Sequence, residues 1–309
     1  MVGMSSEILL DGEVIEIRRL RTPDEYRMVT DTEIEVWGVS DYSSVVAHHV
    51  LIAVDRRGGL VLGAFEKGSG KMVGFVFGFL ARDSSGALYH YSHMTGVLSE
   101  YRYKGVGYLL KLKQREYVIN QGLNLITWTY DPLQSPNARF NVGKLGCVVR
   151  KFYVNYYGEL RDSLNAGMPT DRFEAEWWIS SDLVVKKLSG NYRTPSLEEV
   201  LGLGADFVTT VETINGLPIL SKFDLNLNSK ILLVEIPGDL NKLRSRGDVL
   251  AGWRFGLREV FKHYLNESNY VVVEFISDFD SGFRRSYYVM MKEDVNKILR
   301  GELPWNYVR

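Results

Sequence analysis

The stretch Val97-Leu98-Ser99-Glu100-Tyr101-Arg102-Tyr103-Lys104-Gly105-Val106-Gly107 decides the fold of this chain. It lies between a strand candidate at residues 87–97 and a helix candidate at residues 108–121. Glycines at 105 and 107 let the backbone approach a ligand with its N–H groups pointing outward. The positive end of the helix dipole lies beside them, and Arg102 and Lys104 add charge. Together these features predict an anion site that suits a pyrophosphate.

Two other phosphate-binding motifs do not fit this stretch. Residue 110 is Leu, which excludes the dinucleotide fingerprint Gly-x-Gly-x-x-Gly, and the Gly-Lys-Ser/Thr of a Walker A motif is missing. The spacing Arg102-x-x-Gly105-x-Gly107 after an apolar strand instead resembles the acyl-CoA pyrophosphate loop of the GNAT superfamily of N-acetyltransferases.

A second segment carries the same resemblance. Asn137-Ala138-Arg139-Phe140-Asn141-Val142-Gly143-Lys144-Leu145-Gly146 is similar to the GNAT segment that lies beside the pantetheine arm of CoA. The order of expected elements over roughly the first 180 residues also resembles the family. The string from Trp128 to Asn137 looks like a branch of larger predicted acetyltransferases that carry an appended C-terminal region.

The resemblance implies an α/β (α+β) fold over residues 1–182, with a mixed, splayed central sheet flanked by helices. It also implies acetyl-CoA as the co-substrate, without a metal. The backbone amides around 96–98 would polarise the thioester carbonyl. The residues expected to hold CoA are Val97, Leu98, Arg102, Tyr103, Lys104, Gly105, Val106, Gly107, Asn137 and Lys144.

Candidate acid–base groups lie mainly on the strand before the loop. Strict alternation would place His90 and Ser92 on one face, and Tyr91, His93 and Thr95 on the other. Histidine titrates near neutral pH, so His93, and after it His90, could take a proton from a substrate ammonium. For each of them, the alternative is a hydrogen-bonded histidine within a sheet.

Two further candidates have plainer alternatives. Glu100 could act as a base, or it could be a solvated loop residue. Many GNAT enzymes have a tyrosine at the position of Val142, where it protonates the departing thiolate. Tyr153 could replace that tyrosine, or it could be an aromatic strand residue.

Composition excludes several classes of protein. The 309 residues have a formal net charge of −1, which argues against a general nucleic-acid binder. No apolar stretch is long enough to span a bilayer, no leader peptide is recognisable, and the single cysteine cannot form an internal disulfide. We therefore expect a cytoplasmic protein. The pair His48-His49 suits a surface or substrate rim better than a metal site.

Residues 196–309 are expected to form a second, smaller α/β unit. Strands at 231–236 and 270–275 would flank a helix whose stripe Trp253, Leu257, Phe261 and Tyr264 must be buried, and a right-handed crossover would make these strands parallel. The run of elements echoes that at 87–156, so this unit could be a degenerate GNAT-like half. It lacks a phosphate loop, which predicts that it binds no second CoA. Its role could be to shape the acceptor pocket or to form a homodimer.

Two functions follow from the sequence. The first is a CoA-dependent N-acyltransferase in which a small amine or amino-acid-like acceptor attacks the thioester directly. The second is a non-catalytic acyl-CoA-binding or regulatory module, which Val142 favours because it cannot donate a proton.

Overall fold

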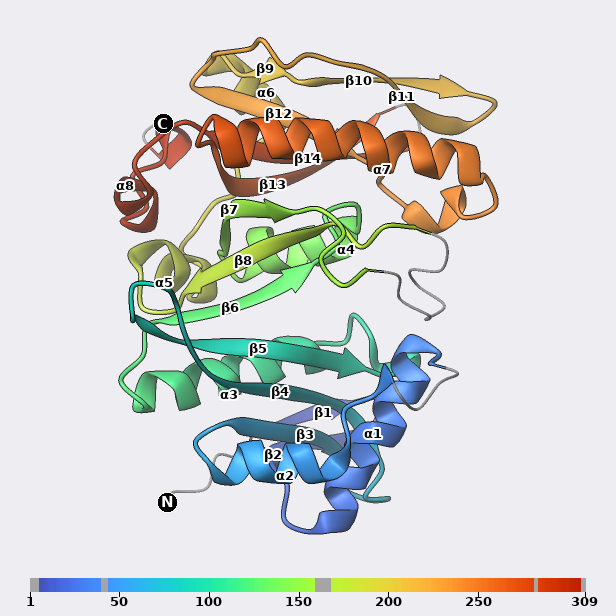
Figure 1. The fold of residues 1–309 in the computed structure, drawn as a ribbon, viewed down its shortest axis with the longest axis vertical. Coiled ribbons are helices and arrows are strands. Elements are labelled where there is room, and N and C mark those ends of the chain that lie inside the picture. The colour runs from blue at the N-terminus through green and yellow to red at the C-terminus, as the bar shows by residue number, and fades with distance from the viewer. Residues whose placement is uncertain (1–5, 40–43, 159–167, 281–282, 307–309) are drawn as a thin grey trace. The chain divides into compact units, whose positions relative to one another are not determined.

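The computed structural model describes residues 6–39, 44–158, 168–280 and 283–306. The chain divides into two compact units (Figure 1). Unit 1 comprises residues 1–128 with 159–167, and unit 2 comprises residues 129–158 with 168–309. Both units combine a sheet with helices, so the chain has a mixed α/β fold.

Unit 1 is built on a sheet with the strand order β1-β2-β3-β4-β5-β6. Pairing is antiparallel from β1 to β5 and parallel between β5 and β6. The elements are β1 (Ser6–Leu10), β2 (Glu13–Arg19), α1 (Pro23–Trp37), α2 (His48–Arg56), β3 (Leu60–Glu66), β4 (Met72–Arg82), β5 (Leu88–Val97), α3 (Val106–Asn120) and β6 (Leu125–Tyr130), the last of which continues into unit 2.

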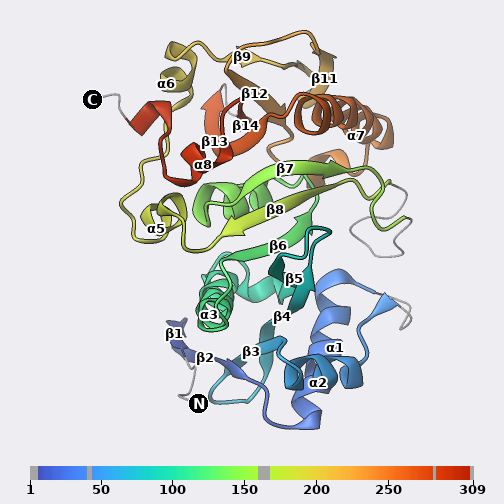
Figure 2. The same ribbon diagram turned by 60° about the vertical axis from the view of Figure 1, so that its left-hand side comes forward.

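The helices of unit 1 cover both faces of this sheet (Figure 2). Alternation along the strands supplies an apolar core on each face. Val106 and Leu110 of α3 pack with buried residues of β2, β3 and β4 on one face. Tyr26 and Val29 of α1, with Leu51 of α2, pack with residues of β3 and β4 on the other. Strands β3 and β4 follow one another along the chain and pair as an antiparallel hairpin.

The residues Thr22-Pro23-Asp24-Glu25 have the pattern of a capping box, and α1 begins there with one difference from that pattern. Thr22 Oγ1 accepts the backbone N–H of Glu25, as in a capping box. The Glu25 carboxylate, however, accepts the N–H of Arg21 rather than that of Thr22. It also pairs with Arg18 of β2, which fixes the helix start against the sheet.

The sheet of unit 1 splays after the first residues of β5. Among the described residues, β5 pairs with β6 only through His90 with Ile126 and Tyr91 with Thr127. From Ser92 to Val97, β5 is paired on its other edge with β4. The predicted separation of these two parallel strands is therefore confirmed, but it begins after Tyr91 and not, as expected, after Val97. One edge of β5 keeps its backbone groups for other partners.

Unit 2 contains a sheet with the order β8-β7-β13-β14-β12-β9 and a separate hairpin, β10-β11. Its strands are β7 (Val148–Tyr153), β8 (Arg172–Trp178), β9 (Asp206–Phe207), β10 (Thr209–Ile214), β11 (Leu217–Phe223), β12 (Ile231–Ile236), β13 (Val271–Asp280) and β14 (Phe283–Met291). Its helices are α4 (Ser135–Ala138), α5 (Asp182–Leu188), α6 (Leu197–Gly202), α7 (Gly247–Phe261) and α8 (Val295–Leu299).

The expectations for the C-terminal residues are met in part. The stripe Trp253, Leu257, Phe261 and Tyr264 is buried, as predicted. Strands β12 and β13 are parallel, but β14 lies between them and is antiparallel to both. In unit 1 the corresponding strands β5 and β6 pair directly. The expected echo therefore holds for the order of elements along the chain and not for the sheet topology.

The compact units do not divide at the boundary expected between residues 182 and 196. Val149 of β7 pairs with Val272 of β13, and Asp131 forms a buried ion pair with Arg254. These contacts join residues 129–158 and 168–182 to the C-terminal residues within unit 2, which is the larger unit. The separate folding of 1–182 and 196–309 stays a prediction.

Candidate functional site

The predicted anion site is built at the turn from β5 into α3. Leu98 is buried and anchors the turn, and a single 3₁₀ turn at Ser99–Tyr101 follows. Gly105 has a φ of 96° and occupies the N-cap of α3, where none of the described side chains caps the helix. The Leu109 N–H makes the first bond of the helix, 3.0 Å to the Gly105 carbonyl. The amides of Val106 and Gly107 precede that bond and have no acceptor within the helix.

The two glycines of the turn have different explanations. Gly105 is explained by its backbone, because a φ of 96° strains other residues. Within the described part of the chain, a Cβ atom at Gly107 would meet only Val97 Cγ2, at an ordinary 3.6 Å. Packing inside the protein therefore does not require glycine at 107, whereas the close approach of a phosphate group to the helix start would.

The basic residues of the loop have partners within unit 1. Arg102 Nε donates to the Val97 carbonyl at 3.0 Å, and its Nη2 donates to the Val36 carbonyl at 3.1 Å. Lys104 forms an ion pair with Asp11 in the β1–β2 turn. Arg102 thus ties the open edge of β5 to the end of α1 besides bringing positive charge to the turn.

The backbone groups at the end of β5 point in alternate directions. The Leu98 N–H donates to the Val73 carbonyl at 3.0 Å, so that amide is engaged with the preceding segment of unit 1. Alternation turns the Val97 N–H and C=O toward the opposite, open edge, where Arg102 reaches the carbonyl. Of these two amides, Val97 suits the predicted polarising role and Leu98 does not.

A β-bulge changes which side chains share a face of β5. Phe77 pairs with Met94 and Gly78 pairs with Ser92, so His93 is an extra residue in the strand. Met94 consequently packs in the core beneath α1 and α2, and Val97 packs in the core beneath α3. The expectation that Thr95 shares a face with His93 is wrong, because the bulge reverses the alternation after residue 93.

His93 is exposed at this bulge and lies among aromatic rings. Its ring centroid is 5.7 Å from that of Phe77, 6.1 Å from that of Phe79 and 6.0 Å from that of Tyr91. Although the side chain reaches solvent, desolvation by its surroundings lowers the pKa of His93. The imidazole is therefore neutral at pH 7 and able to accept a proton.

His90, unlike His93, is buried and bonded to a side chain of α3. Its side chain is fully buried, and its Nε2 lies 3.1 Å from Gln114 Nε2. Desolvation, together with the charge of Lys111, lowers the pKa of His90 to about 3. A group with so low a pKa is a poor base toward an ammonium ion.

The remaining acid–base candidates have partners of their own. Glu100 is exposed and forms an ion pair with Lys71 at 2.6 Å. Tyr153, in unit 2, donates to Glu174 at 3.0 Å and packs beside Tyr156, with ring centroids 5.1 Å apart. Neither contact assigns a catalytic role.

In unit 2, the segment resembling the pantetheine-binding region is a short helix, α4, followed by a π-helix at Arg139–Lys144. Asn137 and Lys144 are exposed, whereas Val142 is fully buried. Lys187 Nζ donates to the carbonyls of Val142 and Gly143 and pairs with Glu274 at 2.7 Å. This buried ammonium holds the π-helix in place.

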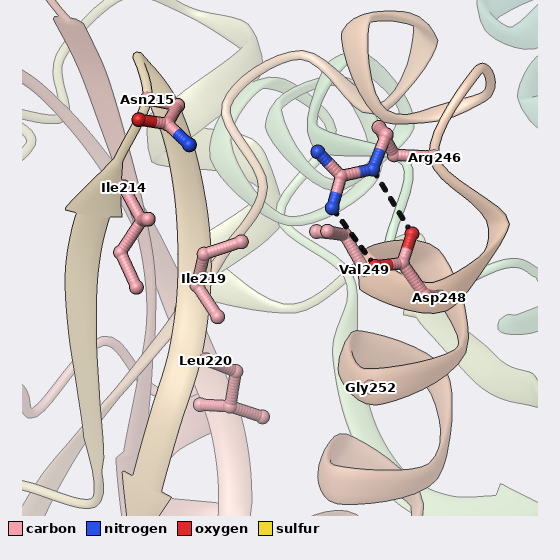
Figure 3. Close-up of a pocket in the computed structure, with 8 residues that line it drawn as sticks. All are labelled: Ile214, Asn215, Ile219, Leu220, Arg246, Asp248, Val249 and Gly252. Carbon is pink, nitrogen blue, oxygen red and sulfur yellow. Dashed lines mark hydrogen bonds and ion pairs between the residues drawn. The ribbon is translucent and has the colours of Figure 1, made fainter.

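Unit 2 has a cavity that none of the residues discussed so far lines (Figure 3). It has a volume of about 270 Å³ and lies between the β10–β11 hairpin and the start of α7. Arg246 and Asp248 form an ion pair at 2.9 Å at its edge. Its lining comprises Ile214, Asn215, Ile219, Leu220, Arg246, Asp248, Val249 and Gly252.

Sequence reasoning missed a buried polar cluster on the α3 side of β5. Lys111 and Gln114 are buried against β5, where they meet Ser92 and His90. Polar residues within the buried stripe of an amphipathic helix were the available signal.

Among the described residues, no group of His, Cys, Asp and Glu side chains is arranged to hold a metal ion. In the same part of the chain, no helix is long and apolar enough to cross a membrane.

No protein-family model and no curated protein matches this sequence. Solved structures that are similar to it include Arabidopsis thaliana Naa50 in complex with a bisubstrate analogue, at 18% identity and a TM-score of 0.41, over 52% of this chain and 97% of that one. Another is the Escherichia coli ribosomal-protein-S18-alanine N-acetyltransferase, at 14% identity and a TM-score of 0.42, over 54% and 94%. A third is a Streptococcus pneumoniae acetyltransferase of the GNAT family, at 16% identity and a TM-score of 0.41, over 52% and 98%.

Proposed function

We propose that this protein is an acyl-CoA-dependent N-acyltransferase, with acetyl-CoA as the acyl donor. One observation carries the proposal: an uncapped helix start with glycines at 105 and 107 follows a strand whose other edge has separated from its parallel neighbour. The helix start fits a pyrophosphate, and the open edge of β5 offers backbone groups to an extended arm.

The residues of unit 1 fit this substrate in defined roles. The amides of Val106 and Gly107 would bind the pyrophosphate, and the Val97 amide would orient the acyl group. His93 would accept the proton of the acceptor ammonium. The neutral amine then attacks the thioester carbonyl: a C–N bond forms, the C–S bond breaks, and its electron pair leaves with sulfur. The second proton lost by the nitrogen passes to solvent. The acceptor we propose is a small amine or amino-acid-like molecule, and Asn137 and Lys144 remain predicted contacts of CoA.

The test is calorimetric titration with CoA. We expect one CoA per chain, with binding abolished by Gly107→Asp, because that change brings a carboxylate to the phosphate position. Gly202→Asp is the matched control, since among the described residues a Cβ at Gly202 meets nothing within 4 Å, and Gly202 belongs to α6 of unit 2. Unchanged affinity in a folded Gly107→Asp variant, or two CoA per chain, would contradict this assignment.

A second candidate function is a non-catalytic acyl-CoA-binding module. The specific observation in its favour is Val142, an apolar and fully buried residue where the resembled family often has a proton-donating tyrosine. Release of free thiol from acetyl-CoA with a panel of primary amines separates the two functions. Turnover that falls in His93→Ala supports the enzyme, and CoA binding without turnover supports the module.

A further inference from the structure

A buried ammonium group lies at the centre of the polar cluster in unit 1. Lys111 Nζ donates to Ser92 Oγ at 2.7 Å and to Gln114 Oε1 at 3.1 Å. It also lies 3.8 Å from the ring centroid of Trp128. Lys111 is only 3% exposed. Taking an ammonium ion out of water is costly, so groups that hold it there need to compensate for its lost hydration.

The rest of the cluster fixes how this ammonium is held. Gln114 Nε2 is a donor, so the neutral His90 ring accepts its hydrogen bond, which turns Gln114 Oε1 toward Lys111. The His90 ring in turn fills space that a side chain at residue 78 would need, because a Cβ at Gly78 would lie 2.3 Å from His90 Nε2. Residues of β4, β5 and α3 therefore combine to set one orientation.

The cluster lies where β5 and β6 begin to separate. Their pairing ends at Tyr91 with Thr127, and the next residues on the two strands are Ser92 and Trp128. These are the residues that Lys111 contacts. From Ser92 to Val97 the open edge of β5 is about 17 Å long, at about 3.3 Å per residue. That length is of the order of the extended arm that joins the pyrophosphate of CoA to its sulfur.

We propose that Lys111 is an electrostatic positioning residue, whose ammonium favours the thiolate form of CoA at the inner end of this gap. The inference rests on the proposed function. When the C–S bond breaks, its electron pair stays on sulfur, and a fixed positive charge in a dry site stabilises that anion. Lys111 keeps its own protons, and the proton of the acceptor leaves through the base. Lys111 thereby stabilises the departing thiolate, which Val142 cannot do because its apolar side chain has no proton to donate.

The main test measures the pKa of the thiol of bound CoA and requires no turnover. Free CoA is bound to the protein, and the ultraviolet absorbance of its thiolate is followed against pH. We expect the bound thiol to have a pKa at least about one unit below that of free CoA, since one unit corresponds to a tenfold preference for the thiolate. The shift should disappear in Lys111→Met. It should persist in Lys113→Met, whose lysine pairs with Glu116 instead.

A second variant guards against misfolding of Lys111→Met. Gln114→Glu keeps the shape of the side chain and sets a carboxylate against the ammonium. We expect it also to raise the pKa of the bound thiol. In turnover assays both variants should lose about a hundredfold in kcat with little change in KM, as for a charge that acts only on the developing anion.

The outcomes separate this inference from the proposed function. Normal CoA binding with the same thiol pKa in wild type, Lys111→Met and Gln114→Glu overturns the role of Lys111 and leaves the acyltransferase standing. Absence of CoA binding to the wild-type protein overturns both.

Discussion

At residue 103 the backbone has a φ of 63°, and the tyrosine side chain is 89% exposed. A left-handed conformation costs a non-glycine residue roughly 1–2 kcal/mol. The strain lies in the loop that leads to the candidate anion site. The fold therefore holds Tyr103 in a strained loop conformation at a cost in stability, as is often found for residues near ligand sites.

Relieving this strain gives the first prediction. Tyr103→Gly should raise the free energy of unfolding by about 1 kcal/mol, because glycine adopts positive φ without strain. Urea denaturation measures the change. Tyr103→Ala is the control: it removes the same exposed ring but keeps a Cβ, so it should give no comparable gain. Equal stability of the two variants would show that the backbone is not strained.

Glu33 of α1 predicts a pH dependence. Its carboxylate is buried and accepts the Val46 N–H at 3.2 Å, and burial raises its pKa to about 7. An acid whose pKa is higher in the folded than in the unfolded state favours folding while it is protonated. That contribution is present below about pH 4.5 and is lost as the pH rises through about 7. The loss is on the order of 3 kcal/mol.

Replacing this carboxyl group tests the sign. Glu33→Gln should weaken the fall in unfolding free energy between about pH 5 and pH 8, and should be more stable than wild type at the higher pH. The exposed residue Glu35, on the same helix, provides the control Glu35→Gln, which should follow the wild-type curve. Parallel curves for wild type and Glu33→Gln would mean that Glu33 ionises normally in the folded protein.

Helix α7 offers a comparison between two glycines on one element. A Cβ at Gly252 would meet nothing within 4 Å, whereas a Cβ at Gly256 would lie 2.5 Å from Leu220 Cδ2 of β11. In a helix interior, alanine is more favourable than glycine by about 1 kcal/mol. Gly252→Ala should therefore raise the free energy of unfolding by up to about 1 kcal/mol, measured by urea denaturation.

Gly256→Ala is the matched variant for this prediction. It gains the same helix propensity but must displace Leu220, so its net effect should be smaller than that of Gly252→Ala or destabilising. The reverse order of stabilities would contradict the packing of α7 against β11. Figure 3 shows Gly252 facing the cavity between the helix and the hairpin.

At the scale of the whole chain, residues 129–158 and 168–182 depend on distant partners within unit 2. The Phe173 ring packs 4.5 Å from that of Phe261 between centroids, and Arg254 makes a buried bidentate pair with Asp131. Removing one partner of a buried ion pair typically lowers the free energy of unfolding by about 3–5 kcal/mol. These contacts join residues that lie 88 and 123 positions apart in the sequence.

Truncation tests this dependence. In a chain that ends at residue 182, β7 loses its pairing with β13, and Phe173 loses Phe261. We expect the amides of Val148–Tyr153 to lose most of their protection from hydrogen exchange, while those of β3 and β4 keep theirs. Full protection of β7 in the truncated chain would instead support the boundary predicted between 182 and 196.

The local sequence determined the elements that carry the candidate anion site. The helix from Pro23 to Trp37, the hairpin of β3 and β4, and the glycine turn before α3 all depend on neighbouring residues, through caps, turn residues and alternation. Such signals are readable because each acts over a few residues.

Only the tertiary structure decided which distant groups meet. At the bulge, β5 has one more residue than β4 between the pairs Phe77–Met94 and Gly78–Ser92. Alternation within β5 alone gives no sign of this extra residue, His93. The meeting of Lys111 with Ser92 and Trp128 requires a helix and two strands to pack together. Likewise, local propensity does not predict that β14 lies between β12 and β13, because strand order depends on which apolar faces are buried together.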